Sequence, residues 1–125
     1  PMLVLTDADP HGLEIVCCYK FGCYSAASEA QYLALPHIRW LGLLPSDVEK
    51  HMLPRQTTMR QTMNDIQKMR SLYSRPYLKA KPEWIHQLNI MRDLKRKAGL
   101  ESIDLNGEYL VKTYLPNKLR YASWL

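Results

Sequence analysis

The 125-residue sequence lacks any apolar run approaching the roughly 18 residues that a membrane-spanning helix needs. Its first residues also lack a signal-peptide pattern, so we expect a soluble intracellular protein. Cysteine is scarce, and the three thiols, Cys17, Cys18 and Cys23, show no paired Cys-x-x-Cys spacing. This argues against a zinc site, and we expect all three to be reduced core residues.

Disorder is excluded by composition, since 46% of the residues are hydrophobic and 10% aromatic. A chain of this length is sufficient for one domain with its own core, here residues 1–125. The sequence shows no internal repeat. Because it begins at Pro1 and a strand is predicted almost at once, we expect it to be cut from a longer protein.

Charge is unevenly distributed along the chain, which carries a net charge of +5. Residues 1–50 contain three Lys and Arg against six Asp and Glu, whereas residues 51–125 contain fourteen against six. An acidic end that could hold a metal is thus joined to a basic end that could hold phosphate. The basic balance agrees with a polyanionic partner.

An apolar run at the start of the chain, Met2–Leu5, leads into two acidic residues, Asp7 and Asp9. Four apolar residues without alternation predict a strand covered on both faces, which Pro10 and Gly12 would end before a helix. Side chains two residues apart on an extended segment point the same way, about 6.6 Å apart. Both carboxylates could therefore bind one hard cation. Mg²⁺ is expected, because it prefers oxygen ligands and can bind carboxylate oxygens and substrate phosphate oxygens at the same time.

Local roles for these side chains stay open. Asp is common at strand ends and before helices, where it accepts hydrogen bonds from nearby backbone N–H groups. His11 fits either a turn residue or a group on the phosphate side of the site. The N-terminus of the helix after Asp9 would favour an anion such as phosphate.

Hydrophobic spacing, prolines and turn residues predict the other elements. They are a helix over 12–21, apolar almost all round and ended by Gly22; a strand over 38–43; a short helix over 46–51 with a Ser46-to-Glu49 capping box; an amphipathic helix from about 59 to 73; and a helix opened by Pro82. The segment 103–111 suits a hairpin or a short helix ending before Pro116, and we favour the helix. Trp124 and Leu125 should dock on the domain. The pattern is that of an α/β fold.

A cluster of basic residues ends the last long helix: Arg92, Lys95, Arg96 and Lys97. Such a cluster is commonly a solvated face, and it is also the kind of surface that contacts phosphate. We consider these four residues candidate DNA contacts.

Six stretches stand out together, in this order and spacing: Thr6-Asp7-Ala8-Asp9-Pro10-His11-Gly12, Tyr19-Lys20-Phe21-Gly22, Ile38-Arg39-Trp40-Leu41-Gly42, Leu44-Pro45-Ser46-Asp47, Arg75-Pro76-Tyr77 and Tyr114-Leu115-Pro116-Asn117-Lys118-Leu119. They resemble the C-terminal Toprim domain of the topoisomerase VI A protein and of its meiotic relative, the Spo-eleven type protein that makes recombination-initiating double-strand breaks. The resemblance covers nearly the whole chain and leans towards the meiotic branch. It departs near Ala98-Gly99-Leu100-Glu101, where relatives have a longer polar helical segment.

The resemblance implies a Toprim α/β fold, a mainly parallel sheet flanked by helices, with the first strand missing here. Asp7 and Asp9 match the family's Asp-x-Asp motif, which binds Mg²⁺ together with a glutamate on an earlier strand. The DNA-attacking tyrosine belongs to a separate winged-helix domain further upstream. No catalytic residue is therefore expected in this fragment, and Tyr19 and Tyr114 match framework positions.

The resemblance also implies how the whole protein works. One protomer presents its tyrosine to the metal site of the other, so a homodimer acting on double-stranded DNA in the nucleus is expected. A topoisomerase VI B-like partner is expected as well, and no membrane association. The fragment alone should be inactive.

Two alternatives remain. One is a non-catalytic DNA-binding and dimerisation scaffold whose acids are structural. The other is a haloacid-dehalogenase-type phosphotransferase, whose nucleophile strand resembles residues 3–9, but the chain has no later Asp-Asp pair to complete that site.

Overall fold

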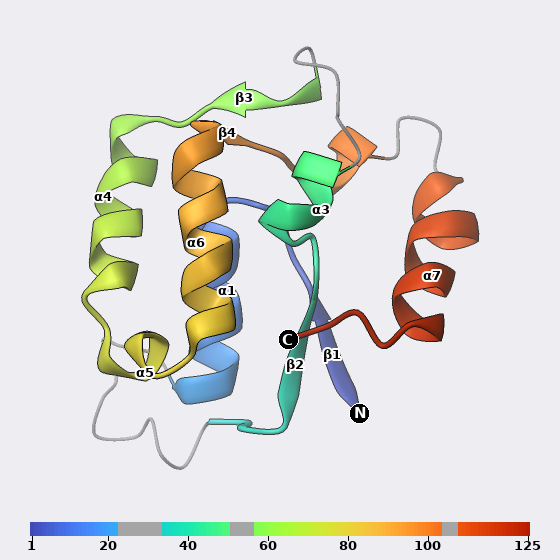
Figure 1. The fold of residues 1–125 in the computed structure, drawn as a ribbon, viewed down its shortest axis with the longest axis horizontal. Coiled ribbons are helices and arrows are strands. Elements are labelled where there is room, and N and C mark those ends of the chain that lie inside the picture. The colour runs from blue at the N-terminus through green and yellow to red at the C-terminus, as the bar shows by residue number, and fades with distance from the viewer. Residues whose placement is uncertain (23–33, 51–56, 104–107) are drawn as a thin grey trace.

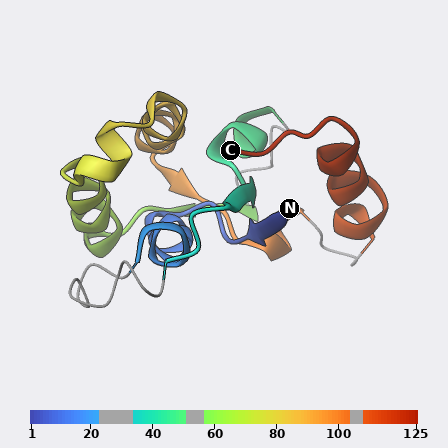
Figure 2. The ribbon, with the colours of Figure 1, turned by 90° about the horizontal axis from the view of Figure 1, so that it is seen from below.

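The fold is built on a parallel pair of strands, β1 (Met2–Leu5) and β2 (Ile38–Gly42). The computed structural model describes residues 1–22, 34–50, 57–103 and 108–125. In the pair, Met2 lies opposite Ile38 and Val4 opposite Trp40. Helices flank the pair on both sides, with α1 (Pro10–Phe21), α4 (Met63–Tyr73) and α6 (Pro82–Leu94) on one side and α7 (Leu115–Arg120) on the other (Figures 1 and 2). The predicted α/β fold class and parallel pairing are confirmed.

The helices and remaining strands follow in chain order: α1 (Pro10–Phe21), α3 (Pro45–Lys50), β3 (Met59–Arg60), α4 (Met63–Tyr73), α5 (Pro76–Lys79), α6 (Pro82–Leu94), β4 (Arg96–Lys97), the 3₁₀ helix η3 (Leu100–Ile103), the π-helix η4 (Leu110–Tyr114) and α7 (Leu115–Arg120). β3 and β4 form a separate antiparallel pair. None of the helices in the described segments combines the length and apolar character that a membrane crossing requires.

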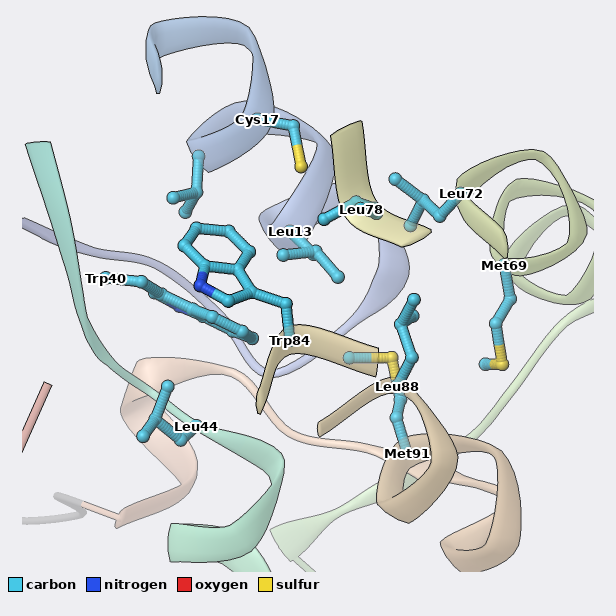
Figure 3. Close-up of a cluster of buried hydrophobic side chains, with 11 residues drawn as sticks. Leu13, Cys17, Trp40, Leu44, Met69, Leu72, Leu78, Trp84, Leu88 and Met91 are labelled. Atoms are coloured by element: carbon cyan, nitrogen blue, oxygen red, sulfur yellow. The ribbon is translucent and has the colours of Figure 1, made fainter. Parts of the chain in front are cut away.

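The larger core cluster lies between β2 and the helices α1, α4, α5 and α6 (Figure 3). At its centre the rings of Trp40 and Trp84 pack with centroids 5.1 Å apart, within the range of favourable aromatic pairs. Leu13 and Leu88 are fully buried beside them. The apolar spacing of α6 that predicted a helix therefore also predicts its core face.

A second cluster on the other side of the strands joins η4 and α7 to the body. Val4 packs against the first cluster and Leu5 against the second, so β1 has contacts on both faces, but none of its residues is fully buried and Met2 is 55% exposed, which corrects the prediction of a buried strand. The buried Tyr114 hydroxyl donates to Asp47 Oδ2 over 2.6 Å, and Lys118 Nζ lies 3.1 Å from the same oxygen. These contacts link residues more than 60 positions apart, and no local sequence pattern indicates them.

Several sequence expectations need correction. α1 is not apolar all round in its packing, because Ile15 and Tyr19 are about half exposed. α3 begins at Pro45, so Ser46 cannot cap it and instead bonds Gln87. The helix favoured before Pro116 is present as the π-helix η4, which ends at Tyr114, but the chain continues directly into α7. Pro116 fits the first turn of α7, where its missing N–H is not needed.

The predicted helix from about residue 59 starts later, at Met63, because residues 59–60 form β3 instead. Its true capping box joins Thr62 and Asp65. The hairpin turn proposed at Asn106-Gly107 and the position of Cys23 lie outside the described residues. At the C-terminal end, Leu125 exchanges backbone hydrogen bonds of 2.6 and 3.0 Å with Trp40, so the predicted docking of this residue is confirmed.

Candidate metal centre

Asp7 and Asp9 flank the junction between β1 and α1, where the chain leaves the strand and turns into the helix. Pairing with β2 continues to Thr6, whose N–H donates to Gly42 and whose carbonyl accepts from Leu43. Both acidic residues are half-buried. They therefore lie at the carboxyl end of a parallel strand, the edge where open α/β sheets bind ligands.

Asp9 is the N-cap of α1, and its Oδ1 accepts a hydrogen bond of 2.6 Å from the Gly12 N–H. Pro10, the next residue, has no N–H to offer. The helix start is thus already satisfied in part by its own cap. The N-terminus of α1 therefore has one N–H donor fewer for the phosphate that was expected to bind there.

Asp7 is bound by a segment more than 90 residues later in the chain. Its Oδ1 accepts a 2.8 Å hydrogen bond from the Leu100 N–H, and Ala8 and Ala98 form a two-way backbone bridge of 2.8 and 3.2 Å. The segment around residues 98–100 therefore supports the acidic motif directly. Sequence reasoning missed this contact because nothing local predicts pairing across 90 residues.

Gly12 allows the close approach of helix and strand. A Cβ at this position would collide with the backbone carbonyl oxygen of Asp7, which cannot swing away as a side chain could. The glycine of the Asp-Pro-His-Gly turn is needed because it sets the spacing between Asp7 and the first turn of α1.

The donor set suits a hard cation but is incomplete. Each carboxylate uses Oδ1 for a backbone N–H, and within the described segments no hydrogen bond or ion pair occupies Oδ2 of Asp7 or Asp9. Nor does any Lys or Arg of those segments form an ion pair with either acid. The same residues contain no cluster of three or more His, Cys, Asp and Glu side chains. The Oδ2 atoms of Asp7 and Asp9 could bind a divalent cation, which would need further ligands from elsewhere.

A buried carboxylate, Asp65, connects the acidic motif to the basic segment. Its side chain is only 1% exposed; Oδ2 lies 2.8 Å from Lys97 Nζ and Oδ1 lies 3.3 Å from His11 Nε2. Thr62 adds hydrogen bonds of 2.7 and 2.9 Å. Burial by itself raises the pKa of Asp65, but the hydrogen bonds from Lys97 and Thr62 outweigh it and lower the pKa below its usual value.

The four basic candidates do not form one surface. Lys97 turns to Asp65, whereas Arg92, Lys95 and Arg96 line a groove between α4 and α6. Arg96 and Lys97 are neighbours in β4, and successive strand residues point to opposite faces. The strand at this position, which no sequence pattern predicted, separates the cluster.

Comparison with known proteins decides the family. The sequence profile of the Toprim domain shared by Spo11 and the topoisomerase 6 A chain matches residues 1–119. This chain belongs to that family. It is 44% identical over its whole length to the human meiotic recombination protein SPO11, and 36% identical to the A-type DNA topoisomerase 6 protein of Arabidopsis thaliana. It is 31% identical, over 96% of its length, to the A-type protein of the type 2 DNA topoisomerase 6 of Methanosarcina acetivorans. The chain spans about a third of the length of these relatives.

The family assignment confirms the Toprim resemblance and leaves the haloacid-dehalogenase interpretation without support. Within this Toprim domain, Tyr114 is poorly suited to be a nucleophile. It is 3% exposed, and its pKa is raised by burial and by the hydrogen bond to Asp47. Cys17 is likewise inert, because burial raises the pKa of its thiol to about 12. Cys17 is a free, buried thiol, as expected, whereas Cys18 is only partly buried and so does not lie in the core as expected.

Proposed function

We propose that this Toprim domain is the magnesium-binding part of a longer topoisomerase-like DNA transesterase that makes meiotic double-strand breaks. The supporting observation concerns Asp7 and Asp9 at the edge of the sheet. Among the described residues, Oδ2 of each acid makes no hydrogen bond, and no Lys or Arg forms an ion pair with either acid. Family membership supplies the context, since relatives bear the names of a meiotic recombination protein and of DNA topoisomerase 6.

In this proposal the residues of the chain hold and orient the carboxylates. The N–H groups of Leu100 and Gly12 fix one oxygen of each acid, which pre-orients the other oxygen towards a ligand. Bound Mg²⁺ would stabilise the negative charge that develops on phosphoryl oxygens during cleavage. His11, which contacts Asp65, is the proposed group on the phosphate side. Lys97 forms an ion pair with the same residue, Asp65.

The remaining parts of the reaction lie outside this chain in the proposal. The attacking tyrosine and a further glutamate ligand come from upstream segments, and the tyrosine is presented by the second protomer of a homodimer. The assembly binds double-stranded DNA in the nucleus with a topoisomerase VI B-like partner. Binding mainly through the DNA backbone predicts affinity that falls with salt.

The decisive variant is Asp7→Asn in the full-length protein. Losing a ligand charge should lower Mg²⁺-dependent DNA cleavage by about 100-fold or more. Glu83→Gln is the control, because Glu83 is an exposed carboxylate in the first turn of α6 that forms no ion pair among the described residues and does not contact the motif. Cleavage by Asp7→Asn at the rate of the unmodified protein would contradict the proposal.

A specific observation favours one second candidate, a DNA-binding and dimerisation scaffold with structural acids. Both Oδ1 atoms already hold backbone N–H groups, which is sufficient reason for an Asp at each position. In that case Asp7→Asn would lower the melting temperature, while Mg²⁺ would change neither the melting temperature nor DNA affinity.

A further inference from the structure

The groove between α4 and α6 combines an apolar floor with a basic rim. It has a volume of about 540 Å³, within the range of pockets that take ligands. Ile66, Met69 and Leu94 supply the apolar side chains. The cations on its lining are Arg60, Arg92, Lys95 and Arg96, and no acidic residue of the described segments lines it.

The apolar surface continues beyond the groove along α4. Ile66 is 37% exposed, and Met63, one turn earlier on the same helix face, is 69% exposed. A patch of large apolar side chains bordered by cations is typical of a surface that binds another protein.

The wall of the groove is fixed by hydrogen bonds from Gln61. Its Nε2 donates to the carbonyls of Met91 and Arg96 over 2.9 and 3.3 Å, which ties the end of α6 to β3 and β4. Arg96 also donates to Thr58 Oγ1 and to the Thr58 carbonyl. The site is therefore preformed, so binding would not need to order it first.

Two rim cations are available for a ligand. Among the residues that the structure describes, no acid forms an ion pair with Arg60 or Lys95. Lys95 also ends α6 with a φ of 56°, a left-handed conformation in which glycine is favoured. The backbone conformation at position 95 favours glycine, yet the residue is lysine. A function of the lysine side chain at the rim of the groove would explain why lysine occupies this position.

We propose that this groove binds a short acidic segment of a partner protein that inserts one large apolar side chain between α4 and α6. Charge complementarity with Arg60 and Lys95 selects the acidic flanks, and the apolar floor takes the anchor. Nucleic acid fits less well, because a phosphodiester strand would use the cations but has no protruding apolar group to fill a concave apolar floor. The proposal does not depend on metal binding at Asp7 and Asp9.

Fluorescence anisotropy with defined probes tests this. The probes are a labelled peptide of alternating glutamate and leucine, a glutamate-only peptide, a peptide of alternating lysine and leucine, and a labelled DNA duplex. The protein should bind the glutamate–leucine peptide, and it should bind neither the glutamate-only peptide nor the lysine–leucine peptide. Ile66→Ser removes part of the floor, and Lys95→Gly removes a cation while keeping a residue suited to the left-handed turn. Each should weaken binding about tenfold.

The control Arg70→Gln removes an exposed cation of α4 that does not line the groove, and it should bind the peptide as the unmodified protein does. Lys95→Gly should also keep or raise the melting temperature, which separates lost binding from lost folding. Failure of the glutamate–leucine peptide to bind, or binding by both groove variants equal to that of the unmodified protein, would overturn the proposal. So would DNA binding that falls in Lys95→Gly and is unchanged in Ile66→Ser, which would make the groove a nucleic-acid surface.

Discussion

Asp65 is the residue whose environment has the clearest consequence for stability. It is buried, carries a lowered pKa and contacts Lys97, His11 and Thr62. No sequence pattern marks it as part of the site, although Thr62-x-x-Asp65 could have been read as a cap by analogy with the Glu-containing box. The contacts with His11 and Lys97 could not have been read, since they depend on how α1, α4 and β4 pack.

The lowered pKa of Asp65 predicts acid sensitivity. A carboxyl that binds its proton more weakly in the folded chain than in the unfolded chain stabilises the fold above the ordinary pKa of 3.8. That stabilisation should be lost as the pH falls from this value through the lower pKa of the folded state. Asp65→Asn should lower the free energy of unfolding at neutral pH by about 1.5–3 kcal/mol and should flatten this part of the pH profile.

Urea unfolding followed by circular dichroism between neutral and acid pH checks the Asp65 prediction. Glu83→Gln is a suitable control, because Glu83 is an exposed acid of the first turn of α6 with no ion pair among the described contacts. A profile for Asp65→Asn that remained parallel to that of the unmodified protein would show that this carboxyl does not stabilise the fold.

At the scale of elements, the sequence predicted those parts of the fold whose signals are local. β1, α1, β2 and α6 lie where apolar spacing and Pro or Gly at the ends placed them. β3 and β4 are only two residues each and exist through their mutual pairing, so no period could reveal them. The same pairing explains why Lys97 faces Asp65 while Arg96 faces the groove.

The junction of β1 and α1 gives the second structural prediction. Gly12→Ala should lower the free energy of unfolding by about 1–3 kcal/mol, because the new Cβ meets the Asp7 carbonyl and forces strand and helix apart. It should also disturb the carboxylates on either side. Thermal unfolding with Gly99→Ala as control checks this.

Gly99→Ala is informative because the atoms nearest to an added Cβ there belong to the carboxylate of Glu101, the far end of a flexible side chain. We expect this variant to unfold close to the unmodified protein. If the two variants were destabilised equally, the backbone contact at Gly12 would not be the cause.

At the scale of the whole molecule, the separation of charge along the sequence does not survive folding. Asp7 of the acidic half accepts a hydrogen bond from the Leu100 N–H of the basic half, and His11 of the acidic half lies 3.3 Å from Asp65, which also pairs with Lys97. That Asp7 and Asp9 bind a metal stays a prediction from the sequence, and the structure adds what holds the two side chains: a helix cap for Asp9 and the 98–100 segment for Asp7. Those supports are long-range and arise only from the packed chain.

The most direct test of the central claim is a Mn²⁺ titration of the ¹⁵N-labelled protein, with Mn²⁺ standing in for Mg²⁺, followed by paramagnetic line broadening in NMR spectra. With only two carboxylate ligands the affinity should be weak, on the order of millimolar. Amide signals of residues 7–12 and 98–100 should broaden first, excess Mg²⁺ should restore them, and Asp7→Asn should abolish the effect while Asp93→Asn retains it. Broadening elsewhere, or the same broadening in Asp7→Asn, would contradict the claim that Asp7 and Asp9 hold the ion.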